Sequence, residues 1–501
     1  MDTSAPAPRH VVPGMAWALH DTDSTRALER AGLAATDRHV LMRRAGLATA
    51  RLALALYPHA STIWIAAGPG NNGGDGMEAA LHLHAAGKRV VLTWLGVRHS
   101  TPDDAAAAHD RVSAAGIRFT DAPPEHWDLC IDALLGIGGR REPQGTMAQW
   151  IARIGQRDAP VLSVDIPTGL HADTGVAAST HVRADATLCL LTLKPGLFTA
   201  DGRDVSRQVW LDDLQCDANA LLPAQAPTAT LIAAPPTQAR WHASHKGSYG
   251  DVAVVGGAPG MAGAALLAAT AALHGGAGRV FVCSLGEGPA SPDANAGMPE
   301  LMRRAVNDVD LARTTIVCGC GGGDQVPGVL PQLLAGAARL VLDADALNAV
   351  ANHTALRRQL LERAQHARTT VLTPHPLEAA RLLGTSVAQV QSDRLNAARQ
   401  LAREHRCTVV LKGSGSVVAS PDGTMGINPT GNARLAVPGS GDVLAGLIGS
   451  ALAAGSSAFD AACHAVYHHG AAADHWPPDE TLTASALARR AGGAAWGRTR
   501  S

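Results

Sequence analysis

The sequence predicts an α/β protein of two domains, an N-terminal Rossmann-like three-layer α/β/α domain followed by a second α/β domain. Three observations lead there. The 501 residues exceed what one hydrophobic core usually serves. Short apolar runs alternate with helical patterns in both halves. Between Leu211 and Trp241 the pattern gives way to Pro-rich, weakly periodic sequence. We therefore predict domains at 1–222 and 223–501.

The first half carries six apolar runs of strand length, separated or preceded by amphipathic stretches of helix length. The predicted strands are 62–67, 89–95, 129–133, 160–164, 186–191 and 208–211. The predicted helices are 37–56, 78–86 and 104–115. Because strands and helices alternate at this spacing, we expect a parallel sheet with helical crossovers.

A second alternation begins after the boundary. The predicted strands are 251–256, 279–284, 315–318, 340–342, 370–372, 408–411 and 416–419, and a long Ala-rich helix ends at Leu273. The halves share a fold class but no repeated sequence. Two sheets, each with its own core, follow from this pattern.

The composition argues against several classes of protein, among them nucleic-acid-binding, secreted and membrane-spanning proteins. A formal net charge of −1 gives no basis for binding nucleic acid or an anionic membrane surface. The first residues lack a basic segment followed by an apolar one, so we expect no signal peptide. The longest apolar run, 261–273, is too short to span a bilayer. We expect a soluble cytoplasmic protein.

Eight cysteines are scattered singly through the chain, mostly within predicted strands. The one close pair, Cys318 and Cys320, lacks the second pair that a structural zinc site needs. We therefore expect buried free thiols.

A glycine-rich segment, Gly68-Pro-Gly-Asn-Asn-Gly-Gly-Asp-Gly76, follows the first predicted strand directly. As a loop before a helix it would bring backbone N–H groups against a phosphate. Its glycine spacing also fits the dinucleotide-binding fingerprint. However, the second strand ends at residues 94–98 without the acidic residue that binds the ribose of NAD, which disfavours ordinary hydride transfer.

Two other predicted strand ends carry carboxylates. Asp132 precedes Gly136 and Gly138, and Asp165 precedes Thr168. A single aspartate at such a place is commonly a helix cap or a turn former. In an open parallel sheet, however, these loops and the glycine-rich segment face one crevice, where ligands bind. Their combination favours a site.

Segments 71–76, 132–138 and 165–170 together resemble the NAD(P)H-hydrate epimerase domain, also called the YjeF N-terminal domain. The resemblance implies a potassium ion held by Asn72, Asp132 and Thr168, where the family usually has Ser in place of Thr. It also implies proton transfer by Asp165 at C6 of the hydrated nicotinamide ring, converting the R hydrate to the S form. The implied substrate-binding residues are Asn71, Asn72, Gly73, Gly74, Asp75, Gly136, Ile137, Gly138, Gly139, Arg140, Arg141, Glu142 and Asp165. Gly139 departs from the leucine common there.

In the second half, Gly439-Ser-Gly-Asp442 opens an apolar helix. Its free N–H groups form an anion site, and Asp442 is placed to accept a hydroxyl proton. A simple capped buried helix would look the same. Upstream, a predicted strand ends at Lys412 and small residues follow to Ser416. This pattern suits a nucleotide-phosphate contact or a solvated strand end.

With segments 245–250, 256–264, 341–348 and 373–376, this half resembles the ribokinase-like fold and, within it, the ADP-dependent NAD(P)H-hydrate dehydratase domain. The resemblance implies that Ala262, Gly321, His375 and Asp442 contact the hydrated nucleotide. It implies that ADP contacts Lys412, Gly413, Ser414, Gly415, Ser416 and Gly441, accompanied by Mg²⁺. Asp442 would deprotonate the C6 hydroxyl, ADP would phosphorylate it, and phosphate would then leave.

Some residues depart from that family pattern. Residues 319–323 read Gly-Cys-Gly-Gly-Gly where Gly-Pro-Gly-Leu-Gly is usual, and Arg434 and Pro438 replace common glycines. The resemblance extends neither to roughly the first thirty residues nor to the Ala/Arg-rich tail after Ala484. We expect that tail and the histidine cluster 464–475 to be solvated surface.

The combined interpretation is a bifunctional repair enzyme. One domain epimerises hydrated NADH and NADPH (NADHX and NADPHX) and the other dehydrates the S form, so that both epimers are rescued. Its partners would be these nucleotides and ADP, in a homo-oligomer, with K⁺ and Mg²⁺ as cofactors. Two rivals remain open. One is a ribokinase-like small-molecule kinase with an accessory nucleotide-binding domain. The other is a non-catalytic protein that senses nucleotides.

Overall fold

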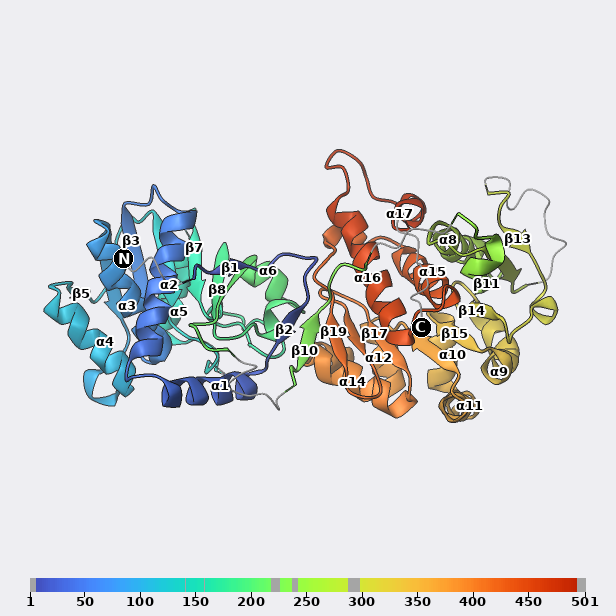
Figure 1. Ribbon diagram of the computed structural model, residues 1–501, viewed down its shortest axis with the longest axis horizontal. Helices are drawn as coiled ribbons and strands as arrows, with labels where there is room; N and C mark the ends of the chain where they lie inside the picture. Colours follow the sequence, from blue (N-terminus) through green and yellow to red (C-terminus); the bar gives the residue numbers. More distant parts are fainter. Residues whose placement is uncertain are drawn as a thin grey trace. The chain divides into compact units, whose positions relative to one another are not determined.

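The computed structural model describes residues 6–139, 141–156, 158–217, 226–236, 242–286 and 298–492. The chain forms two compact units (Figure 1). The first comprises Met1–Val12 and Trp17–Thr230, and the second comprises Pro13–Ala16 and Leu231–Ser501. Within the second unit, Gly14 forms a β-bridge with Ala233. The predicted boundary at residue 222 lies outside the described residues.

The N-terminal unit contains a sheet of order β1-β9-β8-β7-β6-β3-β4-β5, parallel except for β1. Its strands are β1 (Arg9–His10), β3 (Thr62–Ala67), β4 (Arg89–Trp94), β5 (Phe119–Thr120), β6 (Leu129–Ala133), β7 (Val161–Val164), β8 (Ala186–Leu190) and β9 (Gln208–Asp212). The chain adds β4 and β5 on one side of β3 and then returns to add β6 on the other. The strand order therefore reverses between β3 and β6, where open α/β sheets bind ligands.

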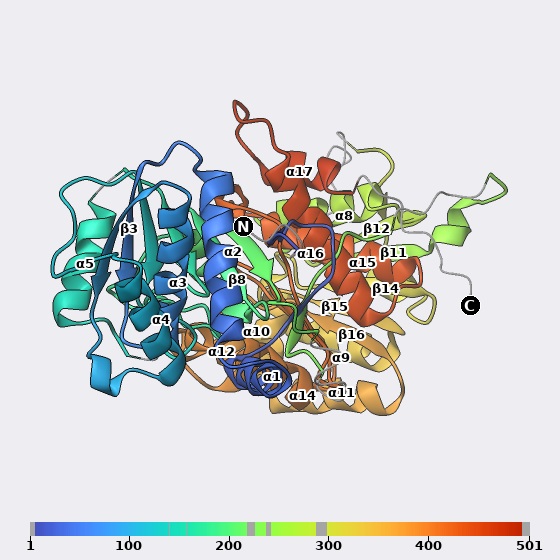
Figure 2. The ribbon, with the colours of Figure 1, turned by 60° about the vertical axis from the view of Figure 1, so that its left-hand side comes forward.

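Helices cover both faces of this sheet. They are α1 (Thr22–Ala35), α2 (Val40–Leu56), α3 (Asn71–Ala85), α4 (Asp103–Ala114), α5 (Gly145–Gly155) and α6 (Gly202–Ser206). Successive side chains of β3 point to opposite faces. Ile63 and Ile65 join the core formed with α2, α3 and α4, whereas Trp64 packs against Trp127 and Trp150 on the α5 side. Figure 2 shows α5 on one side of β3 and α3 on the other. The predicted three-layer domain is confirmed.

The C-terminal sheet runs β13-β12-β11-β14-β15-β16-β17-β18-β19 and is parallel up to β17. Its strands are β13 (Met302–Arg303), β12 (Arg279–Ser284), β11 (Asp251–Gly256), β14 (Thr314–Cys318), β15 (Arg339–Leu342), β16 (Thr369–Leu372), β17 (Thr408–Leu411), β18 (Val417–Ala419) and β19 (Met425–Ile427). Two short strands, β2 (Trp17–Leu19) and β10 (Ala229–Leu231), lie near the division of the chain. Nearly every residue of the central strands is buried, as expected for a sheet covered on both faces.

One face of this sheet packs against α8 (Ala262–His274), α15 (Ser440–Ala453), α16 (Ala458–Asp474) and α17 (Ala484–Arg490). The remaining helices are α9 (Val326–Gly336), α10 (Asp345–Asn352), α11 (Thr354–Gln365), α12 (Pro376–Leu383), α13 (Val387–Ser392) and α14 (Arg394–His405). Helices α8 and α15 approach very closely, because a Cβ atom at Gly446 would lie 2.0 Å from the Ala268 carbonyl oxygen. That contact fixes the start of α15, which carries Asp442.

Two expectations about the C-terminal surface are wrong. The histidine cluster lies on α16, and His469 is only 8% exposed, with its Nε2 2.9 Å from the Ser440 carbonyl oxygen. Burial lowers the pKa of His469 to about 4, so the ring is neutral and donates to that oxygen. The tail after Ala484 begins as α17, where Leu487 and Ala488 join the core. Neither buried face was predicted, because α16 carries several histidines among its alanines and α17 is short and ends in arginines.

The expectation of buried free thiols is confirmed for all eight cysteines. Within the described part of the chain, no helix combines the length and apolar character needed to cross a bilayer.

Candidate functional sites

A cavity of about 400 Å³ opens at the carboxyl ends of β3, β6 and β7. Of the predicted substrate-binding residues, those that line it are Asn71, Asn72, Asp75, Gly136, Ile137, Gly138, Gly139 and Asp165. Helices α1 and α2 also contribute to its wall, through Glu29 and Met42 among others. Gly73, Gly74, Arg141 and Glu142 are not among the lining residues, and Arg140 lies outside the described residues. The cavity thus lies in the predicted crevice, but only some of the predicted substrate-binding residues line it.

The glycine-rich segment is helical rather than a loop, which corrects the sequence prediction. Helix α3 begins at Asn71 with Gly70 as its N-cap. A Cβ atom at Gly73 would lie 2.0 Å from the Gly68 carbonyl oxygen, and one at Gly76 would lie 2.6 Å from Ala133 Cβ. These glycines therefore let the helix pack against the ends of β3 and β6. That packing places Asn72 and Asp75 in the cavity wall.

Asp132 and Thr168 are both fully buried and hydrogen-bonded to each other. The Thr168 hydroxyl donates to Asp132 Oδ1 (2.7 Å), and its backbone N–H donates to Oδ2 (2.9 Å). Ser163 also donates to Oδ2 (2.8 Å). Burial raises the pKa of Asp132, while the hydrogen bonds from Thr168 and Ser163 oppose that rise.

Asn72 carries two buried polar atoms, Oδ1 and Nδ2, that have no hydrogen-bond partner among the described residues. A Cβ atom at Gly136 would lie 3.4 Å from Asn72 Oδ1 and 3.0 Å from Asp165 Oδ2, so these side chains flank the same glycine. Buried polar groups normally have partners, and an orphaned amide oxygen suits a bound cation. An amide, a hydroxyl and a carboxylate form an oxygen donor set that fits a hard cation such as K⁺.

Asp165 has a left-handed backbone conformation with φ of 66°. Its Oδ1 lies 2.5 Å from Lys194 Nζ, and its Oδ2 accepts from the Ile137 N–H (3.2 Å). Lys194 is fully buried and also donates to the Leu190 carbonyl oxygen (2.8 Å). Burial lowers the pKa of Lys194, but the Asp165 carboxylate outweighs this and leaves that pKa raised. Lys194 and the Ile137 N–H therefore hold the Asp165 carboxylate in place in the cavity wall.

Two residues of this site, Lys194 and Glu29, were not predicted from the sequence. A lysine directly after an apolar strand was the only signal for Lys194, and Glu29 lies on α1, outside the region of resemblance. Burial and then the Asp165 carboxylate raise the pKa of Glu29 and raise that of Asp75 well above its ordinary value. The cavity thus holds two carboxyl groups with raised pKa values beside a carboxylate paired with lysine.

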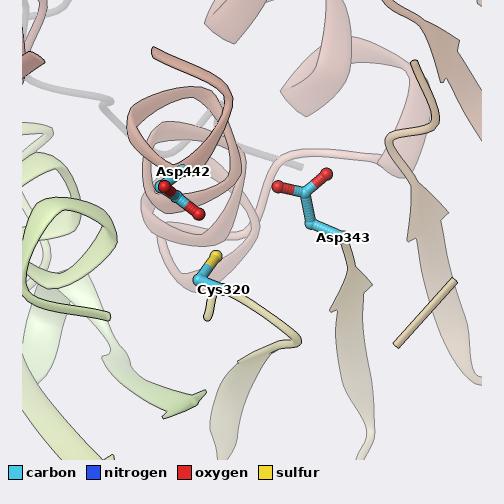
Figure 3. Close-up of side chains that lie close together, drawn as sticks. All are labelled: Cys320, Asp343 and Asp442. Carbon is cyan, nitrogen blue, oxygen red and sulfur yellow. The ribbon is translucent and has the colours of Figure 1, made fainter. Parts of the chain in front are cut away.

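In the C-terminal unit, Asp442 lies in the first turn of α15 and faces two residues from strand ends (Figure 3). Cys320 follows β14 and Asp343 follows β15. The sulfur and carboxylate oxygens of the three residues lie within 4.8 Å of one another. Burial and the Asp343 carboxylate raise the pKa of Asp442 to about 6, whereas a hydrogen bond with Cys320 lowers it. Asp442 is therefore mainly ionised, yet strongly basic for an aspartate, near neutral pH.

Lys412 belongs to the same cluster. Its Nζ lies 2.7 Å from Asp343 Oδ1, an oxygen that also accepts from the Thr373 hydroxyl (2.7 Å). A Cβ atom at Gly441 would lie 3.3 Å from Lys412 Nζ. The side chain of Lys412 is only 18% exposed, so the solvated strand end considered above is wrong. The structure brings together Lys412, Gly441 and Asp442, as the site hypothesis requires.

Arg394 supports the segment after Lys412, a role that the sequence did not reveal. It is almost fully buried and donates to the carbonyl oxygens of Leu411 (3.3 Å) and Lys412 (3.2 Å). Gly413 has φ of 137°, and a Cβ atom there would lie 2.8 Å from the guanidinium. Burial lowers the pKa of Arg394 to about 10. Gly413 is thus required by the backbone conformation and by close approach.

Of the predicted nucleotide contacts, Ala262 is the first residue of α8, Gly321 lies in the loop after β14, and His375 follows β16. His375 caps α12, and its Nδ1 accepts from the N–H groups of Leu377 and Glu378. Gly321 has φ of 58°, and its carbonyl oxygen accepts from the Ala258 N–H (2.7 Å). A Cβ atom at Gly321 would lie 2.7 Å from the Met261 carbonyl oxygen, directly before Ala262.

Cys320, Asp343 and Asp442 do not form a suitable cage for magnesium. Mg²⁺ takes oxygen ligands, and here one donor is a thiol and one carboxylate is already paired with Lys412. A magnesium ion would therefore enter with nucleotide phosphates rather than bind this trio.

Comparisons with known proteins match both units. Residues 38–196 match the YjeF-related protein N-terminus family, and residues 252–491 match the NAD(P)H-hydrate dehydratase family. The bifunctional NAD(P)H-hydrate repair enzyme Nnr of Escherichia coli K12 is 37% identical over 477 residues, covering 92% of this chain and 90% of that protein. The enzyme of the same name from Coxiella burnetii is 34% identical, covering 91% and 94%.

Two further relatives correspond to the C-terminal unit. The ADP-dependent (S)-NAD(P)H-hydrate dehydratase of Neisseria meningitidis is 44% identical over 257 residues, covering 50% of this chain and 85% of that protein. The crystal structure of an ADP/ATP-dependent NAD(P)H-hydrate dehydratase from Bacillus subtilis, co-crystallized with ATP/Mg²⁺, is 32% identical with a TM-score of 0.44, covering 51% and 92%. Because full-length relatives match both units, the chain belongs to the family of bifunctional NAD(P)H-hydrate repair enzymes.

Proposed function

We propose that this chain repairs hydrated NADH and NADPH in two steps, divided between residues 1–222 and 223–501. The first part interconverts the R and S hydrates. The second dehydrates the S hydrate while ADP becomes AMP and phosphate. The observation that carries the proposal is that each unit holds a carboxylate among charged neighbours in a chain related over most of its length to bifunctional repair enzymes: Asp165 pairs with buried Lys194, and Asp442 lies in the first turn of α15 beside the Lys412–Asp343 pair.

Epimerisation requires the hydroxyl at C6 to leave and return on the opposite face of the ring. The departing oxygen needs a proton, and the water that returns must lose one. The Asp165 carboxylate, held by Lys194, is suited to accept a proton. Asp75 and Glu29 keep their protons more strongly and are suited to donate. Together these groups support proton transfer in both directions.

Asn72, Asp132 and Thr168 would hold a potassium ion beside this cavity. When bound, K⁺ would supply positive charge near the substrate's departing oxygen. The fit is supported by the orphaned Asn72 amide and the oxygen donors around it. Replacing K⁺ by a large organic cation should slow epimerisation in the native protein. It should have little further effect in Asn72→Ala, and an equal effect in both proteins would contradict the assignment.

Dehydration would begin when Asp442 accepts the proton of the C6 hydroxyl. The C6 oxygen then attacks the β-phosphorus of ADP, forming a new O–P bond as AMP leaves. Phosphate subsequently leaves C6 and a proton leaves C5, which restores the double bond of NAD(P)H. Backbone N–H groups at Gly439–Gly441 and the Lys412 ammonium are placed to stabilise the transferred phosphate.

The direct test measures the return of the near-ultraviolet absorbance of reduced nicotinamide. The substrate is a mixture of both NADHX epimers, supplied with ADP, Mg²⁺ and K⁺. We expect complete recovery with the native protein. Asp165→Ala should stall once the S form is consumed, apart from slow spontaneous epimerisation. No recovery with either ADP or ATP would overturn the dehydratase assignment and favour a small-molecule kinase. Light scattering of the purified protein would test the expected homo-oligomer.

A further inference from the structure

The thiol of Cys320 lies directly against Asp442. Figure 3 shows the Cys320 sulfur pointing toward the Asp442 carboxylate, with Asp343 beside them. Cys320 is fully buried, and its sulfur lies within 4.8 Å of an Asp442 carboxylate oxygen. A thiol is a weak donor, but toward a buried carboxylate its hydrogen bond is charge-assisted. The contact therefore joins a cysteine to the proposed base of the dehydratase.

Backbone contacts fix the direction of this side chain. The Cys320 carbonyl oxygen accepts from the Gly257 N–H (3.0 Å), which ties the loop to the end of β11. The flanking Gly319 and Gly321 have φ of 117° and 58°, conformations that disfavour other residues. Because the backbone is held on both sides, the sulfur is directed toward α15. The proline usual at this position in the family pattern offers no side-chain donor.

Several charged groups also face Asp442. The carboxylates of Asp343 and Asp345 disfavour its ionised form, and the Lys412 ammonium favours it. However, Lys412 Nζ lies 2.7 Å from Asp343 Oδ1, so its positive charge is paired mainly with Asp343. Within this cluster of Cys320, Asp343 and Asp442, the Cys320 thiol is the uncharged side chain that can donate a hydrogen to the Asp442 carboxylate. The thiol is therefore an uncharged donor that favours the ionised form of Asp442, which Asp343 and Asp345 disfavour.

We propose that Cys320 is a positioning residue of the dehydratase site, donating its S–H to the Asp442 carboxylate and holding it ionised and oriented toward the substrate hydroxyl. This role rests on the proposed dehydratase function. It predicts a specific pH dependence. The hydrogen bond favours the ionised form, so removing it raises the pKa of Asp442 above its present value of about 6. As the pH is lowered, the variant without this hydrogen bond then loses activity at a higher pH than the native protein does.

The kinetic test compares the pH dependence of kcat/KM for dehydration in Cys320→Ala, Cys320→Ser and the native protein. In the alanine variant we expect the acid limb to move up by about one pH unit, as the loss of one charged hydrogen bond implies, with little change in the alkaline plateau. Serine should restore the native limb because its hydroxyl donates to the same carboxylate. A merely structural role would lower activity at every pH without moving the limb, and that result would overturn the proposal.

Two comparisons sharpen this test. Cys318→Ala removes a buried thiol two residues away, on β14, and should leave the pH profile unchanged. Cys320→Pro introduces the residue usual in the family and should behave like the alanine variant if the protein folds. A shifted limb in Cys318→Ala would assign the effect to core packing and contradict the role of Cys320.

A second readout requires no activity. The infrared S–H stretching band of Cys320 can be isolated as the difference between native protein and Cys320→Ala. It should shift as Asp442 titrates near pH 6, and Asp442→Asn should abolish the shift. A band that does not respond to pH would overturn the proposal. A responsive band in a protein that cannot dehydrate NADHX would instead contradict the proposed function while preserving the contact.

Discussion

Lys194 is an ammonium group buried in the N-terminal unit with the Asp165 carboxylate as its partner. Lys194→Met should keep the volume of the side chain but leave that carboxylate uncompensated. We expect the free energy of unfolding to fall by about 3–5 kcal/mol, the usual cost of breaking a buried ion pair from one side. Epimerisation should fall by roughly 100-fold as Asp165 loses its position. Urea denaturation and an epimerase assay measure these effects.

The matched control is Arg207→Ala. Arg207 pairs with Asp185 in the same unit, but the two side chains are 62% and 38% exposed. Such surface pairs contribute less than about 1 kcal/mol. Equal destabilisation by the two substitutions would contradict the special role of the buried pair.

Asp442 should reduce stability at the pH where it functions. Its pKa is raised to about 6 in the folded protein, so the folded state binds more protons than the unfolded state between about pH 4 and pH 6. Stability therefore falls as pH rises through this window. Asp442→Asn should be more stable than the native protein above pH 6, by roughly 1–3 kcal/mol, with the difference shrinking toward pH 4. Urea denaturation at several pH values would show it, and a pH-independent difference would contradict it.

The sequence predicted the acidic residues of both sites from the apolar runs beside them: Asp132 and Asp165 lie at the ends of apolar strands, and Asp442 opens an apolar helix. Asp132, Asp165 and Asp442 could be recognised from their immediate neighbours. The supporting residues could not, because their partners lie far away in the chain. Lys194 meets Asp165 across a strand connection, and Arg394 meets the segment after β17 from another helix. Such contacts depend on tertiary packing rather than local pattern.

At the scale of elements, α3 shows how glycine misleads a local interpretation. Gly73 is required because a side chain would collide with the Gly68 carbonyl oxygen, whereas Gly70 has open space around its Cβ position. Gly73→Ala should lower the free energy of unfolding by about 1–3 kcal/mol or more through overpacking, and should slow epimerisation. Gly70→Ala should change stability little. Thermal unfolding of both variants tests this, and equal effects would refute the packing explanation.

The contact of α8 with α15 offers the same test in the other unit. A Cβ atom at Gly446 meets the Ala268 carbonyl oxygen at 2.0 Å, while Gly328 on α9 has open space. Gly446→Ala should therefore destabilise the protein and impair dehydration, because the start of α15 carries Asp442. Gly328→Ala should be neutral or stabilising by about 0.5–1 kcal/mol, since alanine favours helix. Circular dichroism during heating, with a dehydratase assay, distinguishes them.

Strand positions were predicted within one or two residues because buried parallel strands are short apolar runs with sharp ends. Helix α3 was assigned too late a start because its first turns are rich in glycine, which normally marks a loop. The burial of α16 was missed because histidines are usually surface residues, whereas His469 packs inward with the alanines of this helix. In each failure, tertiary packing overrode local preference.

On the scale of the whole molecule, the two activities should separate cleanly. Asp165→Asn alone should dehydrate only the S hydrate, and Asp442→Asn alone should epimerise without restoring NADH. An equal mixture of the two variants should recover all of the substrate, because the S hydrate can diffuse between molecules. Absorbance of reduced nicotinamide measures recovery. Incomplete recovery by the mixture would show that both sites must act within one molecule.

The segment Pro13–Ala16 belongs to the C-terminal unit although it lies near the start of the chain. During synthesis Gly14 leaves the ribosome long before its bridge partner Ala233, which follows only after most of the N-terminal unit has been made. The second unit can therefore complete its folding only when the segment Pro13–Ala16, synthesised much earlier, pairs with the residues around Ala233. If the gene were divided between the two activities, the segment Pro13–Ala16 would be made with the N-terminal unit and separated from the C-terminal unit to which it belongs.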